Sequence, residues 1–162
     1  MPGQITTNVA GFNVARMIPQ GITVAGDYML VSAYDGSKTT ESVIFVINRK
    51  TKKLCTTVVM PYASHLGGIA YDGTNVWISK GKAVASFPYS VVTNAVNAGT
   101  SYTELAAYKS VSTLDSTASF MGYYNNVLWI GTFRQATSTM KGYQINNKAT
   151  PVSYTHLRAH ET

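Results

Sequence analysis

The sequence predicts an all-β fold, and its composition is the first observation that supports this. Hydrophobic residues make up 45% of the 162 residues and charged residues only 12%, which is low for a globular domain. The chain has 11 tyrosines and many Val, Ile and Thr residues, which favour half-buried strands. Helical periodicity is weak: residues 91–98 come nearest to an amphipathic helix, and we expect a loop or a single turn there.

A repeated segment is the second observation. Three stretches of twelve residues align without gaps: Gly21–Ser32, Gly68–Ser79 and Phe120–Gly131. In each, an apolar strand leads through a turn of Gly, Asp or Asn residues into a second apolar strand. One column of this alignment holds Leu30, Trp77 and Trp129, which lie 47 and 52 residues apart. A repeat of roughly 40–50 residues is typical of one blade of a β-propeller.

The segments after each repeat complete four-stranded antiparallel blades. We therefore predict a partial β-propeller of about three blades, at residues 19–60, 62–111 and 115–148. Later strands are expected at Ser42–Ile47, Leu54–Met60, Ala83–Phe87, Glu104–Ser110 and Met140–Ile145. A basic hairpin turn at residues 49–53 joins the third and fourth strands of the first blade. In the second blade, a polar insertion around residues 93–102 separates the third strand from the fourth. Residues 5–15 are expected to supply an outer strand of a preceding blade. A β-sandwich or barrel is the alternative, but neither requires a repeat of this length.

The C-terminal segment departs from the repeat. Residues 152–162 resemble a translated sequencing adapter, so we expect a metagenomic fragment of a bacterial protein that was cut near Pro151, with a tail outside the fold. His156 and His160 lie in this tail and are excluded as a metal site despite their spacing of four residues. On this interpretation Met1 need not be the natural start.

Composition and motifs argue against several classes of function. Cys55 is the only cysteine, so neither an intrachain disulfide nor a cysteine-based zinc site can form. No apolar run approaches the ~18 residues of a membrane helix, and no G-x-S-x-G elbow, P-loop or dinucleotide motif occurs. The net charge of +6 could favour polyanions, but no nucleic-acid-binding module accompanies it. We predict no cofactor, no nucleic-acid partner and no membrane span; a divalent cation in the parent protein stays open.

Three stretches together carry a family resemblance: Pro19–Thr23, Ser64–Gly73 and Asn126–Gly131. They resemble secreted bacterial β-propellers of the YncE-like and lactonase-like superfamily, which includes gluconolactonases and phosphotriesterases. The resemblance covers roughly residues 15–148 and rests on the order of strands and turns. It implies a parent protein outside the cell or in the cell envelope. It also implies a group that contains metal-dependent lactonases, lyases and propellers that only bind.

Propeller topology predicts where a ligand would bind. The first strand of each blade lines the central channel, so the loops leading into it share one face with the loops between the second and third strands. The candidate ligand-binding residues on that face are Gln20, Tyr34, Asp35, His65, Lys80, Asp115, Ser119 and Arg134. His65 has the chemistry of a general base or metal ligand near neutral pH, or it is a loop histidine bonded to a neighbouring carbonyl.

Most other candidates have a structural alternative. Asp35 is a cation ligand or part of an Asp-Gly turn, and Lys80 and Arg134 hold an anion or are solvated loop charges. Asp72 is expected to form a structural turn, while the tryptophans of the repeat column pack between blades.

The sequence thus predicts a binding or scaffold propeller that recognises a protein, a peptide or a cell-envelope glycan. The alternative is a lactonase- or lyase-like enzyme with its site around His65. The isolated chain is expected to self-associate through exposed blade faces.

Overall fold

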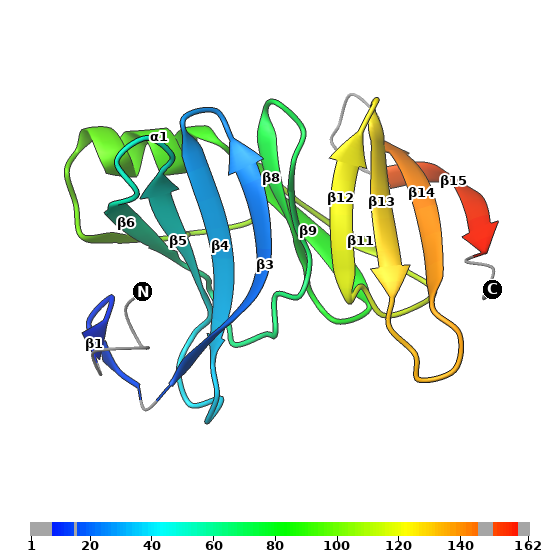
Figure 1. Ribbon diagram of the computed structural model, residues 1–162, viewed down its shortest axis with the longest axis horizontal. Helices are drawn as coiled ribbons and strands as arrows, with labels where there is room; N and C mark the ends of the chain where they lie inside the picture. Colours follow the sequence, from blue (N-terminus) through cyan, green and yellow to red (C-terminus); the bar gives the residue numbers. More distant parts are fainter. Residues whose placement is uncertain (1–7, 15, 146–150, 159–162) are drawn as a thin grey trace.

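Three β-sheets lie side by side in the computed structural model, which describes residues 8–14, 16–145 and 151–158 (Figure 1). Blade 1 has the strand order β3 (Met17–Ala25), β4 (Tyr28–Asp35), β5 (Val43–Asn48), β6 (Leu54–Val59) and β10 (Tyr102–Glu104). Blade 2 has the order β7 (Ile69–Tyr71), β8 (Asn75–Ser79), β9 (Ala83–Pro88) and β11 (Ser110–Thr113). Blade 3 has the order β12 (Phe120–Tyr124), β13 (Val127–Thr132), β14 (Thr139–Ile145) and β15 (Pro151–Arg158).

The repeated segments form equivalent hairpins at the inner edge of each blade. Their register is the same in all three: Thr23 is opposite Leu30, Ala70 is opposite Trp77, and Gly122 is opposite Trp129. The inner strands β3, β7 and β12 are consecutive neighbours in space. This arrangement confirms the prediction of an all-β fold with blades of a propeller, in which each first strand faces the channel.

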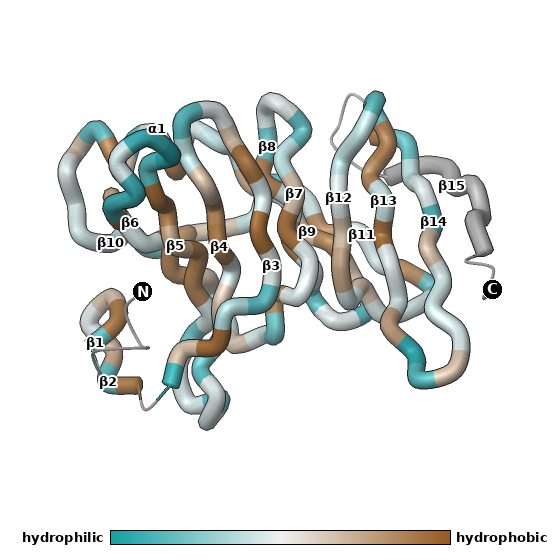
Figure 2. The backbone as a smooth tube through the Cα atoms, in the orientation of Figure 1, coloured by the Kyte–Doolittle hydropathy of each residue, from teal (hydrophilic) through white to brown (hydrophobic). Residues whose placement is uncertain are grey.

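Apolar residues fill the spaces between blades. Figure 2 shows hydrophobic segments running through the strands of all three sheets, with hydrophilic residues gathered in the turns. Because side chains alternate along a strand, the second strand of blade 2, β8, contacts both neighbouring blades. Leu30 packs toward blade 2, in a cluster with Ile69 and Ile78, and Trp77 packs toward blade 3, in a cluster with Leu128. Leu30 and Trp77 of the repeat column therefore pack between blades, as expected, whereas Trp129 is half-buried and belongs to neither of these clusters.

Trp77 also closes the turn that precedes it. Its indole N–H donates to Asp72 Oδ2 at 2.7 Å, and Asp72 Oδ1 accepts the backbone N–H groups of Thr74 and Asn75 at 2.8 and 2.6 Å. Although partial burial by itself raises the pKa of Asp72, these bonds lower it below its usual value. The Asp72–Gly73 turn is structural, in agreement with the sequence prediction.

The insertion in blade 2 differs from the prediction. Helix α1 (Ser90–Asn97) stands where we expected a loop or a single turn, and the chain then adds β10 to blade 1, parallel to β6. The fourth strand of blade 2 is β11, so the predicted strand at 104–110 is wrong in position. Eight residues are too short to be helical alone. Tertiary packing explains the helix, because Val92 is buried in the cluster between blades 1 and 2, which we call the blade 1–blade 2 cluster. By pairing with β6, β10 covers an edge of blade 1.

Two further segments differ from the prediction. Residues 151–158 pair with β14 as the fourth strand of blade 3, although we expected residues 152–162 to lie outside the fold. The exposed edge of β14 is a template for any extended segment that follows it. The described part of 5–15 forms a small hairpin of β1 (Asn8–Val9) and β2 (Phe12–Asn13), which packs on the side of blade 1 that faces away from blade 2. Residues 5–7 and 15, the blade end at 146–148, and His160 lie outside the described residues.

The basic segment at 49–53 forms the predicted hairpin turn. Asn48 Oδ1 accepts the backbone N–H groups of Lys50 and Thr51, both at 2.9 Å, and the basic side chains are exposed. Cys55 is half-buried against the blade 1–blade 2 cluster. In the described part of the chain no helix has the length and apolar character to cross a membrane.

Candidate functional site

The loops named by the sequence prediction gather on one face, at the lower edge of Figure 1. The loop between β4 and β5 contacts the loop leading into β7, because Ser42 Oγ accepts the backbone N–H of Ser64 at 2.8 Å and donates to its carbonyl. The loop between β8 and β9 contacts the loop leading into β12, where the N–H of Ala118 donates to the carbonyl of Gly81 at 2.9 Å. These bonds join the three blades at the face where the candidates lie.

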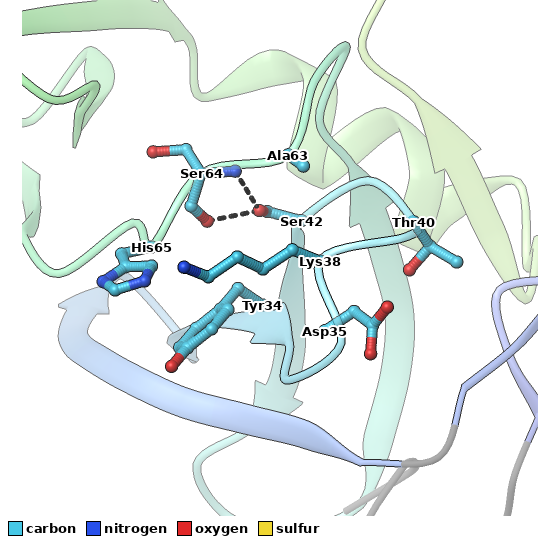
Figure 3. Close-up of a pocket in the computed structure, with 8 residues that line it drawn as sticks. All are labelled: Tyr34, Asp35, Lys38, Thr40, Ser42, Ala63, Ser64 and His65. Carbon is cyan, nitrogen blue, oxygen red and sulfur yellow. Dashed lines mark hydrogen bonds between the residues drawn. The ribbon is translucent and has the colours of Figure 1, made fainter.

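A pocket of about 250 Å³ opens between blades 1 and 2, and we call it the loop pocket (Figure 3). The rings of Tyr34 and His65 stack across it, with centroids 4.4 Å apart and planes 26° from parallel. Figure 3 shows Lys38 pointing its amine toward His65. The hydroxyl oxygen of Thr40, which also lines the pocket, is buried without a hydrogen-bond partner. The pocket thus offers an aromatic pair, a cation and an unsatisfied hydroxyl group.

Asp35 lies at this pocket but is committed to its own loop. Its carboxylate accepts the hydroxyl of Ser37 at 2.7–2.8 Å and the hydroxyl of Thr39 at 2.8 Å, together with both backbone N–H groups at 3.1 and 2.9 Å. Burial alone raises the pKa of Asp35, but these hydrogen bonds outweigh it and hold the pKa far below its usual value. These contacts fit the structural interpretation of Asp35, in which its side chain stabilises a loop turn.

A larger groove of about 560 Å³ lies at the loops that lead into the inner strands of blades 2 and 3, and we call it the inner-strand groove. Its lining residues include Gln20, His65, Gly67, Ser119, Phe120 and Phe133. Ser64 and His65 line both the loop pocket and this groove, so the two lie next to each other. Gly67 packs so closely on the carbonyl of Ser119 that a Cβ atom there would overlap it. Phe133 is 73% exposed, which is unusual for so large an apolar side chain.

Phe120 lines the groove because blade 3 departs from the repeat. In blades 1 and 2 the strand pair carries Gly opposite Ser, and the glycine N–H donates to the serine Oγ: Gly21 to Ser32 at 3.0 Å and Gly68 to Ser79 at 2.9 Å. Blade 3 has Phe120 opposite Gly131, and the phenyl ring covers the glycine so closely that a Cβ atom would overlap it. The sequence alignment contained this exchange, but Phe120 and Phe133 were not among the predicted site residues.

Of the eight predicted residues, Tyr34, Asp35 and His65 meet at the loop pocket, and Gln20, His65 and Ser119 at the groove. The remaining three lie outside both. Lys80 places its amine 4.7 Å from the ring centroid of Tyr62, and Arg134 lies on the exposed β13–β14 loop. Asp115 forms an ion pair with Lys141, which lowers its pKa. Among the described residues, no three His, Cys, Asp or Glu side chains are placed to hold a metal ion together.

Comparisons with known proteins identify the fold. No family model matches the chain, and no curated protein matches it. It is similar to the solved WD40 β-propeller domain of Doa1, with a TM-score of 0.55 and 11% identity over 89% of this chain and 42% of that one. It is also similar to the hydrazine synthase of Kuenenia stuttgartiensis, with a TM-score of 0.58 and 10% identity over 86% of this chain and 36% of that one. The glutaminyl cyclase of Myxococcus xanthus gives a TM-score of 0.53 and 8% identity over 90% of this chain and 53% of that one.

At sequence identities this low, the structural similarity shows a shared fold and says nothing about activity. The chain spans between 36% and 53% of the length of these three structures. Its own geometry agrees with them, because three sheets whose inner hairpins share one register lie side by side around adjacent inner strands. The fold of this chain is therefore that of a β-propeller, represented by three blades.

Proposed function

We propose that this chain belongs to a binding propeller and holds an extended peptide in the inner-strand groove. One observation carries the proposal: in blade 3 the pair Phe120 and Gly131 replaces the Gly–Ser pair of the other two blades. The ring of Phe120 lines the groove as a result. Departures from a local structural rule are expected at functional sites, since elsewhere the rule serves stability. Phe133 adds a second, highly exposed ring to the same groove.

A peptide fits the chemistry of the groove better than a glycan. Two phenyl rings offer apolar surface for side chains, while Gln20, His65 and Ser119 supply polar groups near the groove walls. Ser119 Oγ accepts the N–H of Phe133 at 3.0 Å, which leaves its own proton for a ligand acceptor. The net charge of +6 favours a partner with acidic residues. By its sequence resemblance to secreted propellers, we place such a partner outside the cell or in the envelope.

Removing the exposed ring tests this proposal. Phe133→Ala is expected to weaken peptide binding about tenfold, the effect of losing an aromatic anchor at an interface. The measurement is the binding of short synthetic acidic peptides, each with a central Leu or Phe, on an array followed by calorimetry of the best binder. Val111→Ala removes an equally apolar exposed residue outside the groove and is the matched control.

The same protein is presented to an array of cell-wall oligosaccharides. Retention of these glycans with no retained peptide would replace the peptide proposal by a glycan one. If Phe133→Ala and Val111→Ala bind the selected peptide equally well, the groove is not the binding site.

The lactonase- or lyase-like alternative makes a different prediction. It needs several oxygen ligands around a cation beside His65, whereas both oxygens of Asp35 already accept bonds from Ser37 and Thr39. We therefore expect neither Ca²⁺ nor Zn²⁺ to raise the melting temperature. The measurement is a thermal-shift titration of the wild-type chain and of His65→Ala. Stabilisation by metal that disappears in His65→Ala would favour the enzyme.

A further inference from the structure

Lys38 carries a positive charge at the loop pocket that no group neutralises in the part of the chain that the structure describes. Its amine forms neither an ion pair nor a hydrogen bond there. Asp35 is the acidic residue that lines the same pocket, but its oxygens accept bonds from Ser37 and Thr39. Figure 3 shows the Asp35 carboxylate well apart from the Lys38 amine, which points toward His65. The pocket therefore presents a cation that is available to a ligand.

The loop holds Lys38 in place before any ligand binds. Asp35 accepts the backbone N–H groups of Ser37 and Thr39, the residues on either side of Lys38, at 3.1 and 2.9 Å. The N–H of Lys38 itself donates to the carbonyl of Asp35 at 2.9 Å. These bonds fix Lys38 at a φ of +59°, in the left-handed region, so its side chain leaves the loop in a set direction. A cation positioned in advance favours binding, because little ordering of the loop remains to be done.

The charge and the donors beside His65 select a carboxylate. The Lys38 amine is a donor with one full charge, and a neutral imidazole adds one N–H. A carboxylate can accept from both groups with its two oxygens, in charge-assisted hydrogen bonds. A phosphate dianion fits less well, because one lysine cannot balance its charge and Asp35 adds a negative charge to the same pocket. The stacked rings of Tyr34 and His65 offer apolar surface to the carbon atoms beside the carboxylate.

We propose that the loop pocket binds a carboxylate, and that this group is the free C-terminus of the peptide in the inner-strand groove. The second part rests on the proposed function. Ser64 and His65 line both spaces, so a peptide in the groove can extend past His65 into the pocket. At about 250 Å³ the pocket has less than half the volume of the groove, which suits the last residue of a chain and not its middle. The Lys38 amine would repel an N-terminal ammonium group, so the C-terminus is the end that the pocket accepts.

The pocket is tested alone with N-acetyl-L-leucine, which has the carboxylate of a peptide C-terminus, and with its amide, which lacks the charge. In NMR titrations of the 162-residue chain, the acid is expected to shift the backbone N–H signals of Ser37, Thr39, Ser64 and His65, and the amide to leave them unchanged. Lys38→Gln should weaken binding of the acid at least tenfold, the effect of losing a charged hydrogen-bond partner.

Lys52→Gln is the matched control, because Lys52 is also exposed and has a φ of +60° but lies outside the pocket. It should bind the acid as the wild type does. Both lysines are exposed, so circular dichroism should match the wild type in both variants. No shift with the acid, or a shift that survives unchanged in Lys38→Gln, would overturn the carboxylate site.

The peptide selected for the groove is then compared as a free acid and as a C-terminal amide, by calorimetry in solution. The free acid is expected to bind about tenfold more tightly, and this difference should vanish in Lys38→Gln but persist in Phe133→Ala. Equal binding of acid and amide would overturn the C-terminal assignment, while peptide binding in the groove would stand. If N-acetyl-L-leucine binds through Lys38 but no peptide binds, the carboxylate site stands, whereas the peptide function and the C-terminal assignment fail.

Discussion

Replacing Trp77 with alanine is expected to lower the free energy of unfolding by about 3–5 kcal/mol, the usual cost of emptying a buried tryptophan site. Trp77 is fully buried between blades 2 and 3, where it packs with Ala70 and Leu128. The substitution also removes the indole donor of Asp72. Urea unfolding followed by circular dichroism measures the change. The slope of the unfolding free energy against urea concentration should stay near that of the wild type if the folded and unfolded states keep their compactness.

The repeat provides a matched control at the same alignment position. Trp129→Ala removes an identical side chain that is half-buried on the open side of blade 3, so it should cost less than Trp77→Ala. Trp77→Phe keeps most of the packing and loses the bond to Asp72, which separates the two contributions. Equal losses for Trp77→Ala and Trp129→Ala would contradict the inter-blade role of the repeat column.

Asp35 is expected to make the fold sensitive to acid. Its pKa is lowered in the folded state, so its stabilising contribution is fully present above its unfolded pKa of about 3.9 and is lost as the pH falls through the lower folded pKa. The reason is that Ser37 and Thr39 form stronger hydrogen bonds to the ionised carboxylate than to the protonated acid. At neutral pH Asp35→Asn is expected to cost about 2 kcal/mol or more, since the hydroxyl and N–H donors of the loop lose a charged acceptor.

Melting temperatures from pH 7 down to pH 3 measure this effect. The difference between wild type and Asp35→Asn should shrink as the pH falls below about 4. Asp27→Asn, at an exposed aspartate in the β3–β4 turn, is the control and should follow the wild type throughout. A constant difference across the whole range would mean that the ionisation of Asp35 does not stabilise this loop.

Part of the candidate site followed from the sequence, because topology fixes which loops share a face. The alternation of apolar and polar residues, together with the turn residues, placed Gln20 and Ser119 at the starts of inner strands. It placed His65 in the loop between blades, and all three residues line the groove. Phe133 was missed because a phenylalanine after a strand carries no local signal of exposure. Asp115 was included although Lys141, distant in sequence, pairs with it. Such pairings depend on the arrangement of strands and not on neighbours along the chain.

By itself the sequence determined the repeated hairpins. In Gly21–Ser32, Gly68–Ser79 and Phe120–Gly131, strand, turn and strand are encoded within twelve residues, where local preferences and alternation agree. Their common spacing was enough to predict blades of a propeller. The all-β class and the inner-edge position of each hairpin follow from these short-range patterns.

Only the tertiary structure decided the long-range connections. Helix α1 forms because blades 1 and 2 offer an apolar surface to Val92, and β10 joins blade 1 because β6 has an unpaired edge. The same reason lets residues 151–158 continue blade 3. The face that Phe120 turns to the groove depends on Gly131 across the hairpin. Each of these outcomes is set by a free edge or a free surface elsewhere in the chain, which local sequence does not encode.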